Sequence, residues 1–141
     1  MINLWLIGSG EMAKSYAKVL QALDISFEVV GRGESSANIF SKATGIIPKT
    51  GGISVALKDN AAPNAAIIAV GVEQLSETAT ALIEAGTRHI LLEKPGAGRV
   101  PDAEQIKDAV DQAGVAFQSG YMFRYDQCAN RLRQMVGDGQ F

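Results

Sequence analysis

The sequence predicts an α/β fold: a doubly wound, mostly parallel sheet with helices on both faces. Three observations favour this class. Short apolar runs alternate along the chain with segments whose apolar residues recur every three or four positions, the pattern of buried strands and amphipathic helices. The first apolar run, at 2–7, ends in a glycine turn that opens a helix. The 141 residues are enough for about one domain with a substantial core.

The expected strands are continuous apolar runs, as in parallel strands covered on both faces. They lie at 2–7, 25–30, 65–70, 89–92 and 115–118. The expected helices lie at about 11–23, 35–44, 73–85, 101–113 and 127–136, with a helical turn at 55–60. Gly45, Gly86 and Gly114 are placed to end three of them. Residues 46–52 are expected to form a loop, with at most a short strand.

The helices have predicted inward faces. In the helix at 73–85 the face consists of Leu75, Ala79, Leu82 and Ile83. In the last helix we expect Cys128, Leu132 and Met135 to face the core, so Cys128 is interpreted as a packing residue.

Composition excludes several classes of function. Net charge is -2 with no basic cluster, which argues against a nucleic-acid partner or an anionic membrane surface. The single cysteine, Cys128, excludes an intramolecular disulfide and fits a reducing, cytoplasmic compartment. A metal site is not expected, because His89 is the one histidine. Neither a signal peptide nor a membrane-spanning run of the necessary ~20 apolar residues is expected.

The glycine turn after the first strand fits a dinucleotide pyrophosphate. Gly8 allows a tight bend, Gly10 permits close backbone approach, and Ala13 lets the helix pack on the strand. Free N–H groups of the first helical turn would face the phosphates. We expect cofactor contacts from Gly8, Ser9, Gly10, Glu11 and Met12, and from Val70 and Gly71 after the third strand.

The end of the second strand favours NADP over NAD. NAD sites place an acidic residue here to bind the ribose 2′-hydroxyl. Gly31 stands there instead and leaves room for a 2′-phosphate, while Arg32 and Ser35 offer charge and a hydroxyl donor. Glu34 is an unfavourable neighbour. The alternative is that Arg32 is a solvated turn residue.

Glu93-Lys94-Pro95 and Arg124 follow two later strands, at the edge where ligands bind in open α/β sheets. Lys94 could donate to a substrate hydroxyl or carbonyl, and Glu93 could orient Lys94 or the nicotinamide ribose. Arg124 could bind a substrate carboxylate or hydroxyl. The alternatives are a solvated ion pair for Glu93 and Lys94, and packing for the aromatic residues beside Arg124. His89 is expected at the opposite edge, with a structural role.

These motifs, together with Arg124-Tyr125, resemble the Gfo/Idh/MocA oxidoreductase family. The resemblance covers nearly the whole chain but only the N-terminal half of a typical member. It implies a Rossmann domain that binds NAD or NADP, in an enzyme oxidising or reducing a small-molecule sugar, cyclitol or similar alcohol. It also implies that Lys94 lies beside the nicotinamide and the substrate. The sequence departs from the family at Gly71 and Leu75, where Pro and His are usual.

The resemblance implies a Rossmann domain at 1–125 and a helix at 126–141 that leads towards a C-terminal α/β domain, which is absent. We therefore expect a piece of a longer enzyme, inactive by itself, and a homo-oligomer is possible in the full-length form. A naturally short form is the other option. One alternative function is a non-catalytic dinucleotide-binding module, acting as a sensor or a partner subunit. A flavin mononucleotide domain fits less well, because it leaves the glycine turn without a specific use.

Overall fold

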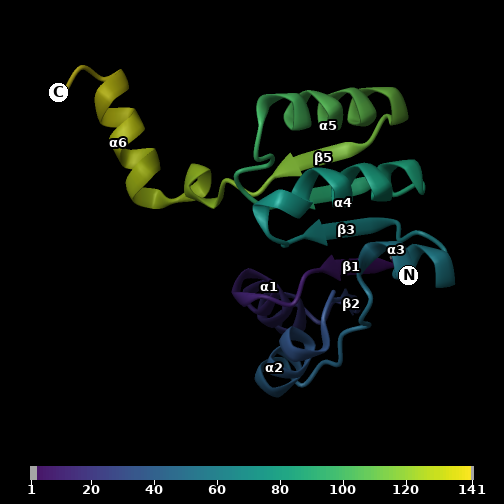
Figure 1. Cartoon of the computed structure of the whole chain (residues 1–141). Coiled ribbons are helices and arrows are strands. Elements are labelled where there is room, and N and C mark those ends of the chain that lie inside the picture. The colour runs from purple at the N-terminus through teal and green to yellow at the C-terminus, as the bar shows by residue number, and fades with distance from the viewer. Residues whose placement is uncertain (1–2, 141) are drawn as a thin grey trace.

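The computed structural model describes residues 3–140, which form a five-stranded sheet between two layers of helices (Figure 1). The strands are β1 (Leu4–Ile7), β2 (Glu28–Val30), β3 (Ala65–Ile68), β4 (His89–Leu92) and β5 (Ala116–Ser119). Their order across the sheet is β2-β1-β3-β4-β5, and every neighbouring pair is parallel. The predicted fold class is confirmed.

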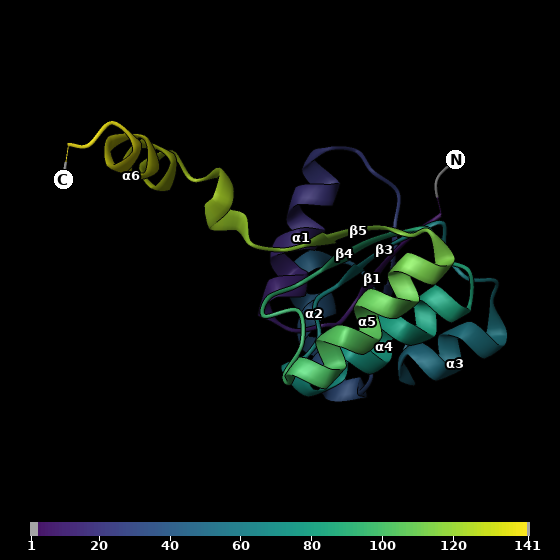
Figure 2. The same ribbon diagram turned by 90° about the horizontal axis from the view of Figure 1, so that it is seen from above.

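The connections between strands are helical. They are α1 (Glu11–Ala22), α2 (Glu34–Thr44), α3 (Gly52–Asp59), α4 (Val72–Glu84) and α5 (Val100–Ala113). Figure 2 shows α1 and α2 on one face of the sheet and α3, α4 and α5 on the other. After β5 come a short 3₁₀ helix, η1 (Met122–Tyr125), and α6 (Gln127–Gly137). None of the helices within residues 3–140 has the length and hydrophobicity needed to cross a membrane.

Two apolar cores lie on the two faces of the sheet, because successive side chains of a strand point to opposite faces. In β1, Trp5 and Ile7 belong to the core under α4, whereas Leu6 belongs to the core under α1 and α2. The predicted inward face of α4 is confirmed, since all four of its residues are buried. Each large side chain buried in this way contributes about 1.5–3 kcal/mol to stability.

Several element boundaries differ from the sequence prediction; among them, β3 ends at Ile68 rather than at residue 70. Pairing with β1 begins at Glu28, so residues 25–27 lie outside the ladder. β5 is shifted by one residue to 116–119. Where one helical turn was expected, α3 forms eight residues of helix. Ala56 is buried there, and Ile53 and Leu57 pack against the same core, a helical spacing that gives the segment an apolar face.

The prediction for the last helix was wrong. Cys128 is exposed, Leu132 is 53% exposed, Met135 is only half-buried, and no residue of α6 is buried. The reason is the path of the chain, because the segment around η1 carries α6 away from the sheet (Figure 2). An apolar stripe on a helix predicts a buried face only if another surface lies within reach.

Candidate functional site

The residues that follow the strands are aligned at one edge of the sheet. The hydrogen-bond ladder continues past the strand ends, with each of these residues donating its N–H to the last residue of a neighbouring strand. The bonds run from Gly8 to Val30 (2.8 Å), Ala69 to Ile7 (2.8 Å), Glu93 to Ile68 (2.9 Å) and Gly120 to Leu92 (2.7 Å). Four segments distant in the sequence therefore meet at the edge where ligands bind in open α/β sheets.

The glycine turn is built by two glycines with different constraints. Gly8 has φ +119°, and a Cβ there would come 2.2 Å from the Ala69 carbonyl oxygen. Only glycine allows this contact between the turn and the chain after β3. Gly10 has no heavy atom within 4 Å of its Cβ position, so its exposed backbone is open to a ligand. Ala13 is fully buried, as its packing role requires.

A cavity of about 910 Å³ lies over this turn. Its size is within the range of roughly 300–1,000 Å³ typical of ligand sites. It is lined by most of the predicted cofactor-binding residues, namely Gly8, Ser9, Gly10, Glu11, Met12, Arg32, Ser35, Val70 and Gly71. Glu93, Lys94 and Arg124 are not part of this lining.

Four helices begin at the cavity without a capping side chain. The residues at their N-terminal caps are Gly10 for α1, Gly33 for α2, Gly51 for α3 and Gly71 for α4, and none supplies a side-chain hydrogen bond to the first turn. The N–H groups of these first turns are therefore available to a ligand, and the helix dipoles favour negative charge there. An open glycine backbone and uncapped helix starts fit the pyrophosphate of a dinucleotide.

The end of β2 is supported by a segment that runs parallel to it. Lys49 donates its N–H to Val29 O, Gly51 to Arg32 O and Gly52 to Gly31 O, over 2.8–3.1 Å. The Arg32 side chain passes beside Gly52, whose Cβ position is 3.9 Å from Arg32 Cγ. None of the ion pairs found within residues 3–140 involves Arg32.

Two residues of this region, Gly31 and Glu28, bear on the expected NADP preference. A Cβ at Gly31 would point at Ser9 Oγ, 3.1 Å away, and at Pro48, so this glycine permits packing within the protein rather than leaving room for a ligand. Glu28, by contrast, pairs with Lys49 Nζ at 3.0 Å and lies at the start of β2. It is therefore remote from the ligand edge, where NAD sites place their acidic residue.

The sequence did not identify two groups of lining residues. One is the start of α3, where Gly51, Gly52, Ile53 and Ser54 face the cavity. The other is one side of α4, with Gln74, Glu77 and Thr78. The glycine pair was a signal for the first group, because Gly51 has φ +100° and Gly52 has φ +76° at the helix start. The α4 residues carry no motif.

The Glu93-Lys94-Pro95 turn lies next to α1. Glu93 is 3% exposed, and its Oε1 accepts a hydrogen bond of 2.7 Å from the Tyr16 hydroxyl. Burial raises the pKa of Tyr16 far above its ordinary value, and the hydrogen bond and negative charge of Glu93 raise this pKa further. The Lys94 side chain is exposed, and none of the ion pairs of the described segment includes it.

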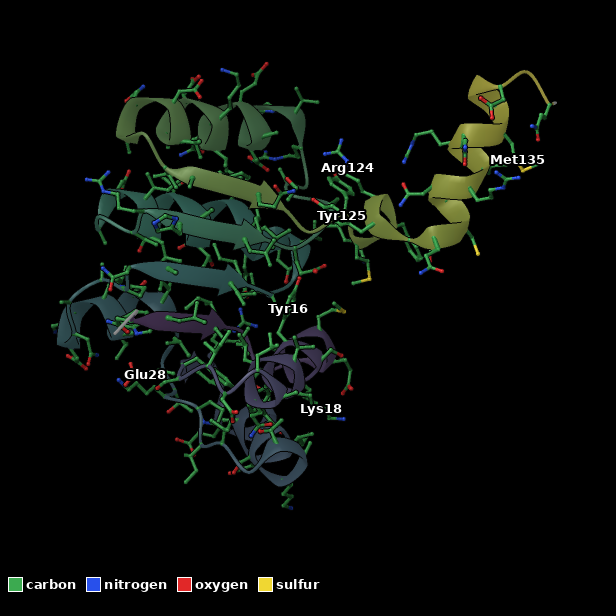
Figure 3. The ribbon with its side chains drawn as sticks, turned by 180° about the vertical axis from the view of Figure 1, so that it is seen from behind. Tyr16, Lys18, Glu28, Arg124, Tyr125 and Met135 are labelled. Carbon is green, nitrogen blue, oxygen red and sulfur yellow. The ribbon has the colours of Figure 1, made fainter. Side chains whose placement is uncertain are left out.

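Arg124 and Tyr125 lie beyond the end of β5, on η1, as Figure 3 shows. Both are exposed, and neither lines the cavity. His89 is exposed at the start of β4, at the edge opposite the ligand, as expected. Leu75 is fully buried in the core, so this position supplies no polar group to the site.

Comparison with known proteins agrees with this geometry. Residues 2–121 match the family model described as "Oxidoreductase family, NAD-binding Rossmann fold". The WlbA dehydrogenase of Bordetella pertussis, solved with NADH and UDP-GlcNAcA, has 25% identity and a TM-score of 0.80 over 99% of this chain and 44% of its own. A search of curated proteins finds no match.

Two further solved structures share the fold. Biliverdin reductase of Synechocystis, solved with biliverdin and NADP⁺, has 20% identity and a TM-score of 0.81 over 96% of this chain and 43% of its own. A putative myo-inositol dehydrogenase of Sinorhizobium meliloti has 20% identity and a TM-score of 0.78, over 99% and 42%. The chain thus spans less than half of each of these proteins.

The fold and the family match identify an NAD(P)-binding Rossmann domain of an oxidoreductase family. The chain belongs to the Gfo/Idh/MocA family.

Proposed function

We propose that this chain is the cofactor-binding part of a dehydrogenase that prefers NADP and acts on a sugar, a cyclitol or a similar alcohol or carbonyl compound. One observation carries the proposal: the glycine turn, Arg32 and the Lys94 turn all lie at the same edge of the sheet, in the strand order β2-β1-β3-β4. This order places Arg32 on one side of the glycine turn and Lys94 on the other. Adenosine would lie towards Arg32, and nicotinamide towards Lys94.

The residues of the proposed site form two groups, one that binds the cofactor and one that acts on the substrate. Uncapped N–H groups of α1 and α4 hold the pyrophosphate, while Arg32 and Ser35 bind the 2′-phosphate. A nicotinamide dinucleotide held by these residues would supply the hydride-transfer chemistry. Lys94 holds a proton at Nζ and donates a hydrogen bond to the substrate oxygen, which stabilises negative charge there during hydride transfer. Arg124 contributes a further donor for substrate oxygens.

A division of the chain into two parts belongs to the same proposal. We propose residues 1–125 as the dinucleotide-binding domain and 126–141 as the start of a connection to a further domain that completes the substrate pocket. The exposure of Lys94 and Arg124 supports this, because substrate groups are normally enclosed on more than one side. The isolated chain should then bind dinucleotide with little or no turnover.

The test is a fluorescence titration of the 141-residue chain with NADPH and with NADH, following energy transfer from Trp5, the one tryptophan. NADPH should bind more tightly. Arg32→Ala should weaken NADPH binding by about tenfold or more, the cost of a charge-assisted bidentate contact, and leave NADH binding unchanged. Arg131→Ala, on exposed α6, is the matched control. No binding of either cofactor would refute the proposal, and tighter NADH binding would refute the assignment of Arg32.

A second function is favoured by Leu75 and Gly71, because buried Leu75 brings no polar group to the substrate side. In this reading the domain senses dinucleotide without catalysis. Lys94→Ala in the longest available form of the protein separates the two. An enzyme would lose most of its kcat, whereas a sensor would keep its affinity and its response.

A further inference from the structure

The bond between Tyr16 and Glu93 joins two segments 77 residues apart. Tyr16 belongs to α1, the helix that starts at the glycine turn, and Glu93 opens the turn that carries Lys94. Figure 3 shows the Tyr16 side chain pointing from α1 towards the ends of the strands. With a rise of about 1.5 Å per residue, Tyr16 stands roughly 9 Å along the helix from Gly10. The helix α1 therefore starts at the glycine turn and, through Tyr16, also contacts the turn that carries Lys94.

The Glu93 carboxylate is held on several sides. Its Oε1 accepts from the Tyr16 hydroxyl at 2.7 Å, and its Oε2 accepts from the Lys94 N–H at 3.2 Å. Gly120 packs so closely that a Cβ there would come 2.9 Å from Oε1. No ion pair of residues 3–140 involves Glu93, so the Tyr16 hydroxyl is its one side-chain donor among these residues.

The carboxylate supplies one of the hydrogen bonds that hold the turn. Besides the Lys94 N–H bound by Oε2, the Gly96 N–H donates to the Glu93 carbonyl oxygen at 3.0 Å. On the outer side, the Tyr121 hydroxyl donates to Pro95 O at 3.1 Å. Loss of the Tyr16 hydroxyl would leave a buried carboxylate short of a donor, and such a group moves towards water. The Lys94 backbone would move with it.

We propose that Tyr16 is a positioning residue: its hydroxyl fixes the Glu93 carboxylate and thereby places the Lys94 turn relative to the glycine turn. This inference rests on the proposed function. It adds that the nicotinamide side of the site is aligned by α1, the same helix that presents the pyrophosphate site.

The experiment compares Tyr16→Phe with Tyr125→Phe, which makes the same chemical change on a tyrosine that is 71% exposed and has no hydroxyl bond in the described structure. Two ligands are titrated, NADPH and adenosine 2′,5′-bisphosphate, which lacks the nicotinamide half. Tyr16→Phe should weaken NADPH binding about fivefold or more, as expected for one lost hydrogen bond to a charged group, and change binding of the bisphosphate less than twofold. Tyr125→Phe should change neither.

Amide hydrogen exchange gives a readout that needs no ligand. Exchange at Lys94 should be faster in Tyr16→Phe and unchanged in Tyr125→Phe. Glu93→Gln should show the same acceleration, and the double variant should add little to either single change. Equal losses for both ligands, or wild-type exchange at Lys94, would overturn the inference. If the wild type binds neither ligand, the proposed function fails, while the exchange result still decides whether Tyr16 holds the turn.

Discussion

Gly8 and Gly10 are glycines for different physical reasons. Gly8 is demanded by the fold, through a positive φ and the contact with Ala69 O. Gly10 has ordinary φ of -87° and open space at its Cβ position, so only a ligand would require its small size. The motif therefore combines one glycine that the fold requires with one that the proposed binding of a dinucleotide would require.

Substitution separates these two requirements. Gly8→Ala should lower the free energy of unfolding by about 1–3 kcal/mol or more, because a non-glycine residue is strained at this φ and its Cβ would overlap Ala69 O. Gly10→Ala should change stability by less than about 1 kcal/mol yet weaken dinucleotide binding. Urea unfolding and NADPH titration measure the two effects. A destabilised Gly10→Ala that binds normally would contradict this division.

The raised pKa of Tyr16 gives a pH dependence. The pKa is above its ordinary value of 10.0 in the folded chain because of burial, and then because of the bond to and charge of Glu93. The stabilisation that protonated Tyr16 gives to the folded chain is therefore fully present below the pKa of this tyrosine in the unfolded chain. It is lost as pH rises through the pKa of Tyr16 in the folded chain. Wild type should lose stability relative to Tyr16→Phe only at strongly alkaline pH, which denaturant unfolding from pH 8 upwards would show. If the difference in stability between wild type and Tyr16→Phe already changed near neutral pH, the raised pKa of Tyr16 would be contradicted.

At the scale of elements, the strands and the helices from α1 to α5 pack together in two apolar cores, whereas α6 has no buried residue. Its N-terminus is capped by Asp126, whose Oδ1 accepts from the Ala129 N–H at 2.9 Å. Its side chains bury no apolar face, and an isolated helix of 11 residues is marginal in water. The cap is thus a large part of what maintains this helix.

Two changes test the independence of α6. Asp126→Ala should cost the helix about 1 kcal/mol and speed amide exchange within residues 128–137. The global melting temperature should change by less than about 2 °C, since α6 buries nothing against the sheet. Asp138→Ala, past the last helical residue, is the control. A large drop in melting temperature would show that α6 packs on the body.

At the scale of the whole molecule, the cavity joins the ends of β1, β2 and β3 with the starts of α1, α2, α3 and α4. A ligand in it contacts elements from both faces of the sheet. Binding should therefore stabilise the entire domain rather than one loop.

Thermal unfolding with NADPH tests this coupling. At a free NADPH concentration about 100 times Kd, binding to the folded chain adds about 2.7 kcal/mol to the free energy of unfolding. This raises the melting temperature of a chain of this size by roughly 5–10 °C. Gly10→Ala should show a smaller shift at the same concentration. A wild-type chain whose melting temperature does not move would contradict specific binding to the folded state.

The sequence by itself determined the alternation of strands and helices, the ends of helices at Gly45 and Gly114, and the glycine turn. These features depend on local periodicity and on backbone conformations that few residues adopt. Nine of the predicted cofactor residues line the cavity for the same reason, since each follows a strand or starts a helix. Their contacts with a cofactor remain predictions.

Only the tertiary structure decided which groups became neighbours. It placed Tyr16 against Glu93, aimed the Cβ position of Gly31 at Ser9, and brought the start of α3 to the cavity. It also left the apolar stripe of α6 without a covering surface. The physical reason is that each outcome depends on the distance between segments far apart in the chain. Helical or strand periodicity gives no information about that distance. It indicates which face of its own element a residue occupies, but not which other segment packs against that face.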